Sequence, residues 1–368
     1  MMQKSFIRRY SKKLIVTLQV LLILFFLLGC LLPYLPIELF WWGGFIGIAL
    51  PYCTILLLLS TLFWLIVKPR FVLLCLFALL LGYKQMSVMF GLNFKANFNT
   101  VKSKESIRFV TWNIESFNGL ANKNSQKKII ENEIINTLKD LQADVVCFQE
   151  FNSSPQNNHV ELLKTVFKYA YFAPDFDKFS NGYGGGSAIF SKFPIINTQQ
   201  NFYSTEESLL FADIKKGDDT IRVFTTHLKS FKFSKENYDE IENIKTIKTV
   251  DKSATKSVVK KMKEAFVLRG KQTKEVVSIL NKNNYPSILC GDFNDVPNNY
   301  IYWQLRKNRQ DAFIDKGYGL GRTYLKLART LRIDYILPDY NFDIQQVDLI
   351  DEGLSDHALL VADLNLKK

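Results

Sequence analysis

The sequence predicts an α/β domain that follows a set of membrane-spanning helices. Up to Leu92 the apolar residues form long runs, whereas beyond it they come in short segments separated by polar turns. Several of these short segments are typical of buried strands, and each of those ends in a polar side chain. Another segment, Gln126 to Leu141, has apolar residues at helical spacing.

Residues 1–97 are predicted to form a membrane anchor. The first apolar run, 14–35, is long enough for a spanning helix, which needs roughly 20 residues. A signal peptide would have a shorter apolar core, so we favour an anchor, although Gly29-Cys30 faintly resembles a lipobox. The segment before this run is basic, with Lys4, Arg8, Arg9, Lys12 and Lys13.

Two further apolar runs follow, and we predict that both span the membrane. The second run, 40–67, contains Pro51 and begins with Trp41 and Trp42, which suit a membrane interface. The third run, 71–92, is interrupted by Lys84. The polar segment 93–106 lacks periodicity and is predicted to be a linker to the domain at 98–368.

The basic residues predict how the chain is oriented in a cell (plasma or inner) membrane. They cluster before the first run and between the second and third runs, and basic loops stay on the cytoplasmic side. Three crossings would then put the domain at 98–368 on the outer or periplasmic face. If the third run does not cross, the domain is cytoplasmic instead.

Charge and cysteine content narrow the function classes. The net charge is +12, but residues 1–100 hold nine Lys and Arg against one acid, whereas the remainder holds 38 against 34. The soluble part therefore lacks the strong basic excess of a nucleic-acid-binding domain. Of the five cysteines, Cys147 and Cys290 lie in predicted strands, and no spacing indicates a metal knuckle or a disulfide framework.

Polar side chains stand at the ends of the predicted strands, where ligands of open α/β sheets tend to lie. Asp292 and Asn294 follow the strand Ser287 to Cys290; taken alone, this Gly-Asp-Phe-Asn segment would favour a simple turn. The other strand-end residues are Asn113 after 107–112, Glu150 after 143–148 and His227 after 221–226.

A buried carboxylate predicts a further contact. Asp334 lies inside the apolar strand 332–337, and isolated ionised carboxylates are rarely buried without a partner. His357, in Ser355-Asp356-His357, follows about twenty residues later and is the natural candidate.

Two segments have less specific patterns. The Gly-rich stretch 182–186 lacks a phosphate-loop spacing and is expected to be a loop at a cleft rim. The Lys-rich stretch 229–284 is predicted to be mainly helical, with an insertion near its start. Its Lys252, Lys256 and Lys260 share one face, whereas Val259, Met262 and Phe266 share another.

Six motifs occur in one order: TWNIESFNG, ADVVCFQEF, TTHLKS, GDFNDVP, RIDYIL and SDHALL. Together they resemble the endonuclease/exonuclease/phosphatase (DNase I-like) superfamily over about Ile107 to Leu364. The resemblance implies a four-layer α/β sandwich, with two mixed sheets between layers of helices. It also implies a hydrolase of phosphate esters that uses Mg²⁺, with Mn²⁺ as an alternative.

The resemblance also implies roles for the strand-end residues. Glu150 would be the principal metal ligand, with Asn113 and Asp356 near the ion. Asp292 would orient or deprotonate the attacking water, and His357 would contact the phosphoryl oxygen or act as an acid or base. Asn294 and His227 would hold the phosphate, and Asp334 would orient His357.

Three functions remain compatible with the sequence. We favour a membrane-anchored phosphodiesterase or phosphatase, because tethering favours a substrate such as a lipid headgroup. A Mg²⁺-dependent endonuclease acting on DNA or RNA is the second possibility. A non-catalytic, membrane-tethered binding protein is the third, and the complete set of motifs argues against it.

Overall fold

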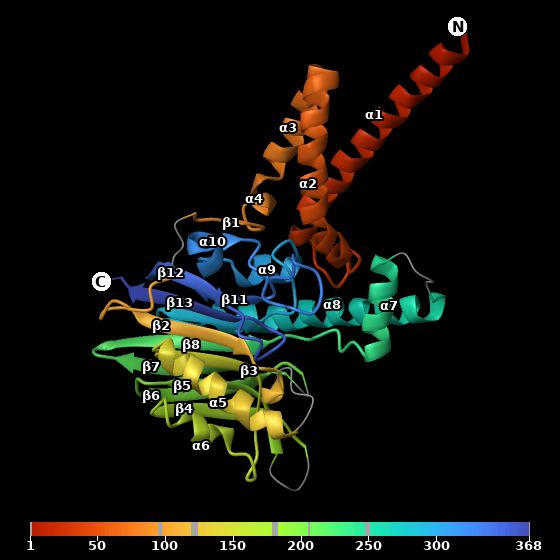
Figure 1. The fold of residues 1–368 in the computed structure, drawn as a ribbon. Coiled ribbons are helices and arrows are strands. Elements are labelled where there is room, and N and C mark those ends of the chain that lie inside the picture. The colour runs from red at the N-terminus through yellow and green to blue at the C-terminus, as the bar shows by residue number, and fades with distance from the viewer. Residues whose placement is uncertain are drawn as a thin grey trace.

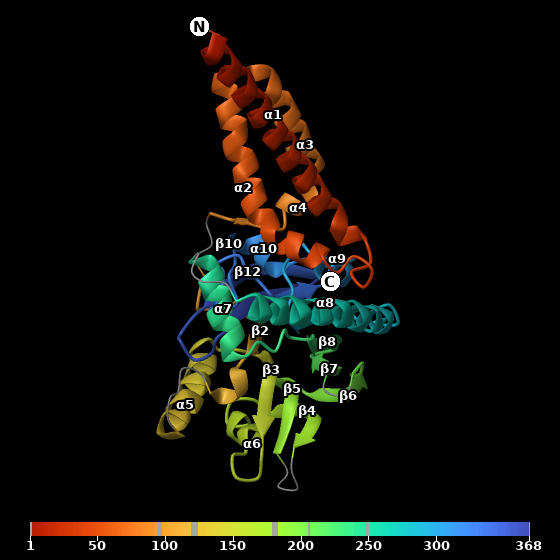
Figure 2. The same ribbon diagram turned by 90° about the vertical axis from the view of Figure 1, so that its right-hand side faces the viewer.

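The computed structural model describes residues 2–94, 98–118, 124–178, 183–204, 207–246 and 251–367. Within these ranges two large mixed β-sheets pack face to face, and helices cover their outer faces (Figure 1). The N-terminal helices project from one side of this sandwich, as Figure 2 shows from a second direction. The predicted four-layer α/β sandwich is confirmed.

The first sheet has the strand order β12-β13-β2-β3-β5-β4. Strands β2 and β3 run parallel, whereas the other neighbours are antiparallel. Nearly every residue of β2 and β3 is buried, because both faces of the sheet are covered. The strands are β2 (Ile107–Asn113), β3 (Val145–Ser153), β4 (Tyr169–Lys178), β5 (Tyr183–Ser191), β12 (Phe342–Ile350) and β13 (Leu359–Leu366).

The second sheet has the order β11-β9-β8-β7-β6. Its parallel pair is β8 and β9, so each large sheet contains a parallel pair whose strands end at the same edge. The strands are β6 (Ile195–Phe202), β7 (Ser208–Lys216), β8 (Asp219–His227), β9 (Ser287–Asp292) and β11 (Asp334–Pro338).

Three apolar layers hold the sandwich together. One lies between the sheets and includes Phe109 and Cys290. A second lies between the first sheet and the helices α5 (Asn124–Asp140) and α6 (His159–Leu163). The third lies between the second sheet and the helices α8 (Lys252–Leu280) and α9 (Tyr300–Leu305). The remaining elements of the domain are η3 (Glu115–Phe117), α7 (Lys235–Lys245), α10 (Ala312–Lys316) and β10 (Tyr318–Gly319).

The Gly-rich stretch differs from the prediction of a loop. Its described residues belong to β5, where Gly184 pairs with Asp177 and Gly186 pairs with Pro174. A Cβ atom on Gly186 would lie 2.8 Å from the backbone nitrogen of Asp175. These glycines therefore permit a close approach between strands. Gly182 lies outside the described residues.

The Lys-rich stretch forms α7 and α8, which confirms the helical prediction and its division near the start. Lys252, Lys256 and Lys260 are exposed, as their shared face predicted. Of the apolar face, Phe266 is buried and Met262 packs against the same cluster, whereas Val259 is 39% exposed and its neighbour Val258 is buried instead.

Two N-terminal helices of the described chain are long and apolar enough to cross a membrane: Tyr10–Tyr34 and Gly43–Val67. They correspond to α1 (Met2–Leu31) with the short η1 (Leu32–Tyr34), and to α2 (Gly43–Val67). Less than a third of each apolar window is buried, unlike the core helix of a soluble protein.

The third predicted spanning run, 71–92, does not form one continuous helix. This run forms η2 (Pro69–Phe71), α3 (Val72–Leu81) and α4 (Tyr83–Met86), none of which reaches membrane length alone. The helix α3 ends at Gly82, where an added Cβ atom would lie 2.3 Å from the ring of Phe26. The close contact with α1 therefore coincides with the break.

The N-terminal region packs directly on the catalytic domain. Ile37 and Val88 belong to the same apolar cluster as Phe266 of α8. Gly47 of α2 is so close to Asn299 that an added Cβ atom would lie 1.8 Å from its Oδ1. After α4, the strand β1 (Gly91–Leu92) pairs with β10. The strand that precedes the predicted linker, 93–106, is therefore already part of the packed structure of the domain.

Candidate active site

Three polar side chains stand side by side at the edge of the second sheet. Asp292, the last residue of β9, is in register with His227 at the end of β8 and with Asp334 at the start of β11. These residues come from distant parts of the sequence, and the strand pairing alone aligns them. The strand register therefore brings three of the predicted site residues together at this edge.

The backbone around Asp292 depends on a glycine. Gly291 has φ +129°, and a Cβ atom there would lie 2.0 Å from the carbonyl oxygen of Thr226. The next strand can therefore approach closely only because this residue has no side chain. Asn294 has φ +52° and donates its backbone N–H to Asp292 Oδ1 at 2.8 Å. Its side-chain amide donates to the carbonyl oxygen of Leu228 at 2.9 Å, which ties the loop to the end of β8.

The first sheet contributes Asn113 and Glu150 from its parallel pair. A β-bulge interrupts β3, because Phe148 pairs with Ala188 whereas Phe151 pairs with Gly186. Glu150 lies in this bulge with φ +51°, and bulges commonly redirect a side chain. The Asn113 side-chain amide donates to Glu150 Oε1 and to Asp292 Oδ2, at 3.1 Å each. One amide thus joins acids from both sheets.

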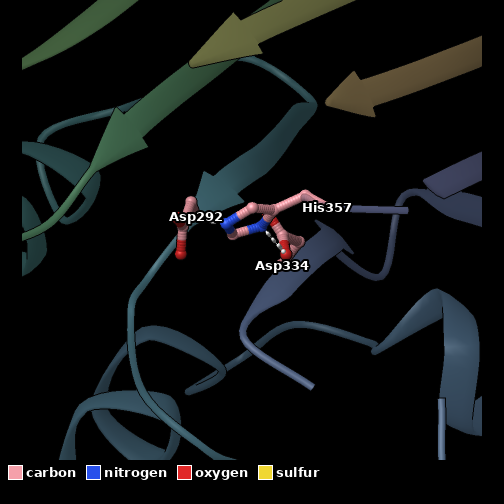
Figure 3. A group of neighbouring side chains, drawn as sticks. All are labelled: Asp292, Asp334 and His357. Carbon is pink, nitrogen blue, oxygen red and sulfur yellow. Dashed lines mark hydrogen bonds and ion pairs between the residues drawn. The ribbon is translucent and has the colours of Figure 1, made fainter. Parts of the chain in front are cut away.

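His357 and Asp334 form a buried pair. His357 Nδ1 lies 2.9 Å from Asp334 Oδ2, and Figure 3 shows the imidazole between Asp334 and Asp292. The other ring nitrogen, Nε2, is 3.8 Å from Asp292 Oδ2. The backbone of His357 is also fixed, because its carbonyl oxygen accepts a hydrogen bond from Trp112 Nε1 at 3.0 Å. The predicted partnership of Asp334 and His357 is present.

The surroundings raise the pKa of two of these groups, for different reasons. Burial, together with the negative charge of Asp334, raises the pKa of Asp292 to about 6. Burial opposes protonation of His357, but the carboxylates of Asp334 and Asp292 outweigh it and raise the pKa of His357 to about 10. Near neutral pH the group therefore contains a carboxylate of unusually high basicity beside an imidazolium.

His227 approaches the same acids from a more open position. Its Nε2 lies 3.7 Å from Asp292 Oδ2 and 3.8 Å from Glu150 Oε1, and it has no hydrogen-bond partner within the described structure. The side chains of His227 and Glu150 are 21% and 39% exposed, whereas that of Asp292 is 1% exposed. The group thus combines a buried carboxylate, Asp292, with the more exposed side chain of Glu150, which a ligand can reach. The Nε2 atom of His227 is itself buried.

Asp356 has a partner that sequence analysis did not identify. Lys326 Nζ lies 2.7 Å from Asp356 Oδ2 and 2.8 Å from Glu115 Oε1. Burial, followed by repulsion from Asp356, contributes to raising the pKa of Glu115, although Lys326 acts in the opposite sense. Lys326 lies in a loop with no periodic pattern, so no local signal predicts this bridge between two acids.

The oxygen-rich group around Asn113 fits a hard divalent cation. Glu150 and Asp292 direct carboxylate oxygens to the same amide, and cations such as Mg²⁺ prefer oxygen ligands and retain waters. A tighter group, Asp292, Asp334 and His357, also has ligand atoms within 4.8 Å of one another. It is less suited to Mg²⁺, because a cation there would compete with the hydrogen bond between His357 and Asp334.

Residues of both sheets share one cavity of about 190 Å³. Of the residues predicted for the site, Glu150, Asp292, Asn294, Asp356 and His357 line it. Asn113, His227 and Asp334 adjoin it through the contacts described above.

Comparisons with known proteins agree with this geometry. A family model described as the Endonuclease/Exonuclease/phosphatase family matches residues 110–357, and one described as a domain of unknown function (DUF8431) matches residues 12–89. No curated protein matches the chain.

Solved structures show the same fold at low sequence identity. An endonuclease/exonuclease/phosphatase from Beutenbergia cavernae is 18% identical, with a TM-score of 0.52 and 72% of each chain covered. A family protein from Leptotrichia buccalis is 16% identical, with a TM-score of 0.50 over 71% of this chain and 100% of that one. The human nocturnin catalytic domain is 19% identical, with a TM-score of 0.50 over 74% of this chain and 98% of that one.

Proposed function

Since the chain belongs to the endonuclease/exonuclease/phosphatase family, whose members hydrolyse phosphoric esters, we propose that it is a membrane-anchored, divalent-metal-dependent hydrolase of phosphate esters. The observation that carries this proposal is the junction at Asn113. There, acids from both sheets meet beside a buried histidine that is held by a second acid. Hydrolysis of an anionic ester needs such a combination of a base and positive charge.

Glu150 and Asn113 would hold the metal ion, with Asp356 nearby. Rotation of the Asn113 amide would exchange its N–H₂ group for an oxygen ligand, and Asp356 would have to exchange Lys326 for the ion. A bound Mg²⁺ would neutralise phosphate charge and polarise the phosphoryl oxygen. The exposure of the Glu150 side chain leaves room for the waters that Mg²⁺ retains.

Asp292 is the proposed base. Its carboxylate accepts one proton from water, whose oxygen forms the new bond to phosphorus as the bond to the ester oxygen breaks. The departing oxygen then takes a proton from solvent. A pKa of about 6 leaves Asp292 ionised at neutral pH yet basic enough to accept a proton.

His357 is proposed to bind a phosphoryl oxygen as an imidazolium. The attacking and leaving oxygens lie roughly in line on opposite sides of phosphorus. Because His357 Nε2 is only 3.8 Å from Asp292, it is on the side of the attacking water and poorly positioned for the leaving group. His227 Nε2, which has no hydrogen-bond partner among the described residues, would bind a second phosphoryl oxygen beside it. Asn294 contributes by fixing Asp292, because its backbone N–H holds one carboxylate oxygen.

We further propose that the domain lies on the outer or periplasmic side of a cell membrane. The basic N-terminal end of α1 lies far from the domain in Figures 1 and 2, as does the turn that contains Lys68 and Arg70. Basic loops favour the cytoplasmic side. After that turn, α3 and α4 return the chain to the domain. Protease treatment of membrane vesicles of known orientation would test this: only right-side-out vesicles should expose the domain.

The activity can be tested with the full chain in detergent and the soluble diester bis(4-nitrophenyl) phosphate. We expect hydrolysis with Mg²⁺, and at least about 10²-fold less with EDTA or in Asp292→Asn, which lacks the base. Asp343→Asn, an exposed site on β12, is the matched control. Plasmid DNA is assayed in parallel, and Mg²⁺-dependent nicking would favour the endonuclease alternative. If no ester, including DNA and lipid, is hydrolysed, the chain is a binding protein and the proposal is wrong.

A further inference from the structure

One wall of the active-site cavity comes from a candidate membrane helix. The cavity that contains Asp292 and His357 is also lined by Ile48 of α2. This part of α2 is packed firmly on the domain. Gly47 packs against Asn299, and the ring centroids of Phe45 and Phe266 lie 5.5 Å apart in an edge-to-face contact. The proposed membrane anchor is therefore part of the active-site wall.

Ile48 begins an apolar stripe along α2. The stripe consists of residues separated by four and three positions, which lie on one face of a helix. Beyond Ile48 every member is at least 51% exposed, although all are large and hydrophobic. The stripe runs from the cavity toward the far end of the helix and comprises Ile48, Tyr52, Ile55, Leu59, Leu62 and Ile66.

Other parts of the cavity wall are also apolar. Phe231, Val296, Leu327 and Leu331 line the cavity. The loop that carries Leu327 and Leu331 reaches the stripe itself, because Thr330 Oγ1 lies 3.3 Å from the hydroxyl of Tyr52. The polar residues lie on the strand-end side, so the cavity combines a phosphate-binding end with a hydrocarbon-like wall.

The charges in the cavity favour a single phosphate group over a nucleic-acid strand. Among the described lining residues, Lys232 is the one lysine or arginine, whereas four are acidic: Glu150, Asp292, Asp295 and Asp356. A strand of nucleic acid is bound through several phosphates, and such sites need many cations. This lining instead suits one phosphate with a metal ion, attached to an apolar group.

We propose that the substrate is a phosphate ester of a membrane lipid, which reaches the active site from the bilayer along the stripe that begins at Ile48. The lipid phosphate would lie beside Asp292 and His357, and its hydrocarbon part would pass along Ile48 and Leu331 into the bilayer. This inference rests on the proposed hydrolase function and names its substrate class.

The test compares two kinds of substrate, membrane lipids and a soluble diester, with the full-length protein reconstituted into vesicles. The lipid substrates are phosphatidylethanolamine, phosphatidylglycerol, phosphatidylinositol and sphingomyelin in the vesicles, with product measured as released phosphate ester. The soluble substrate is bis(4-nitrophenyl) phosphate. Ile48→Trp would fill the cavity mouth, whereas Ile66→Trp makes the same change at the far end of the stripe, where Ile66 is 86% exposed.

We expect Mg²⁺-dependent hydrolysis of at least one lipid. Ile48→Trp should lower kcat/KM for that lipid at least about fivefold more than it lowers kcat/KM for the soluble diester, and Ile66→Trp should change neither. Retained hydrolysis of the soluble diester shows that the variant is folded. If Ile48→Trp fails this control, Ile48→Asn, which adds polarity without bulk, replaces it with the same expectation.

The outcomes distinguish the inference from the proposed function. Hydrolysis of the soluble diester with every lipid left intact would overturn the inference and leave the hydrolase function standing. If Ile48→Trp and Ile66→Trp reduce lipid hydrolysis equally, or if neither reduces it, the proposed entry route is wrong. Loss of all hydrolysis in the wild-type protein would refute both.

Discussion

His357 Nδ1 lies 2.9 Å from Asp334 Oδ2, and the two side chains are 5% and 1% exposed. The remaining oxygen of Asp334, Oδ1, has no partner within the described structure. A buried carboxylate of this kind is stabilised chiefly by a positive charge beside it. The pair therefore favours an imidazolium, and it orients Nε2 toward Asp292.

Replacing Asp334 should weaken catalysis through His357. In Asp334→Asn the imidazolium loses its adjacent negative charge, so kcat should fall by about 10²-fold. Because the pKa of His357 is raised to about 10 in the folded protein, activity is lost as pH rises through that value. The substitution should move this alkaline limb to lower pH in a pH–rate profile. Asp339→Asn, at the other end of β11, is the control; an unmoved limb in Asp334→Asn would contradict the assignment.

Activity should also have an acid limb that depends on Mg²⁺. Asp292 must be ionised to accept a proton, so activity should fall as pH falls through about 6. A bound cation favours the carboxylate, and the midpoint should therefore move to lower pH as Mg²⁺ increases. The measurement is kcat against pH at several Mg²⁺ concentrations. A midpoint that stays fixed would separate Asp292 from the metal site.

Glu150→Gln should lose metal binding while keeping the fold. The substitution preserves shape but removes the charge from the bulge of β3. We expect loss of most activity and weaker binding of Mn²⁺, measured by electron paramagnetic resonance, with an unchanged unfolding temperature. Glu161→Gln, an exposed acid on α6, is the matched control. Wild-type activity of Glu150→Gln at low Mg²⁺ would refute the ligand assignment.

Gly47→Ala tests the contact between α2 and the domain. In an unconstrained helix this change would stabilise by about 1 kcal/mol. Here the new Cβ atom would lie 1.8 Å from Asn299 Oδ1, so we expect destabilisation of about 1–3 kcal/mol from overpacking. The measurement is the unfolding temperature of the full chain in detergent, with Ala49→Val on the same helix as control. Stabilisation by Gly47→Ala would show that the contact is loose.

Local sequence patterns determined most of the fold and the polar residues of the site. Strands β2, β3, β8, β9 and β11 were all recognisable, because short apolar runs with polar ends are a property of neighbouring residues. The burial expected for Asp334 also predicted that it has a partner, because an unpaired buried charge is unfavourable in any fold.

Only the tertiary structure decided which side chains share a surface. Strand register aligns His227, Asp292 and Asp334, and the bulge directs Glu150, yet neither follows from periodicity. Lys326, which forms an ion pair with Asp356, lies in a loop whose sequence has no periodic pattern.

The N-terminal helices show the same division. Apolarity determined that α1 and α2 are long and hydrophobic, but not where α3 ends or that Ile48 reaches the active site. The hydrophobicity of a segment depends only on its own residues, so it can be predicted from the sequence of that segment. Contacts between helices and domain depend on shape, such as the space left by Gly47 and Gly82, which appears only when distant segments pack together.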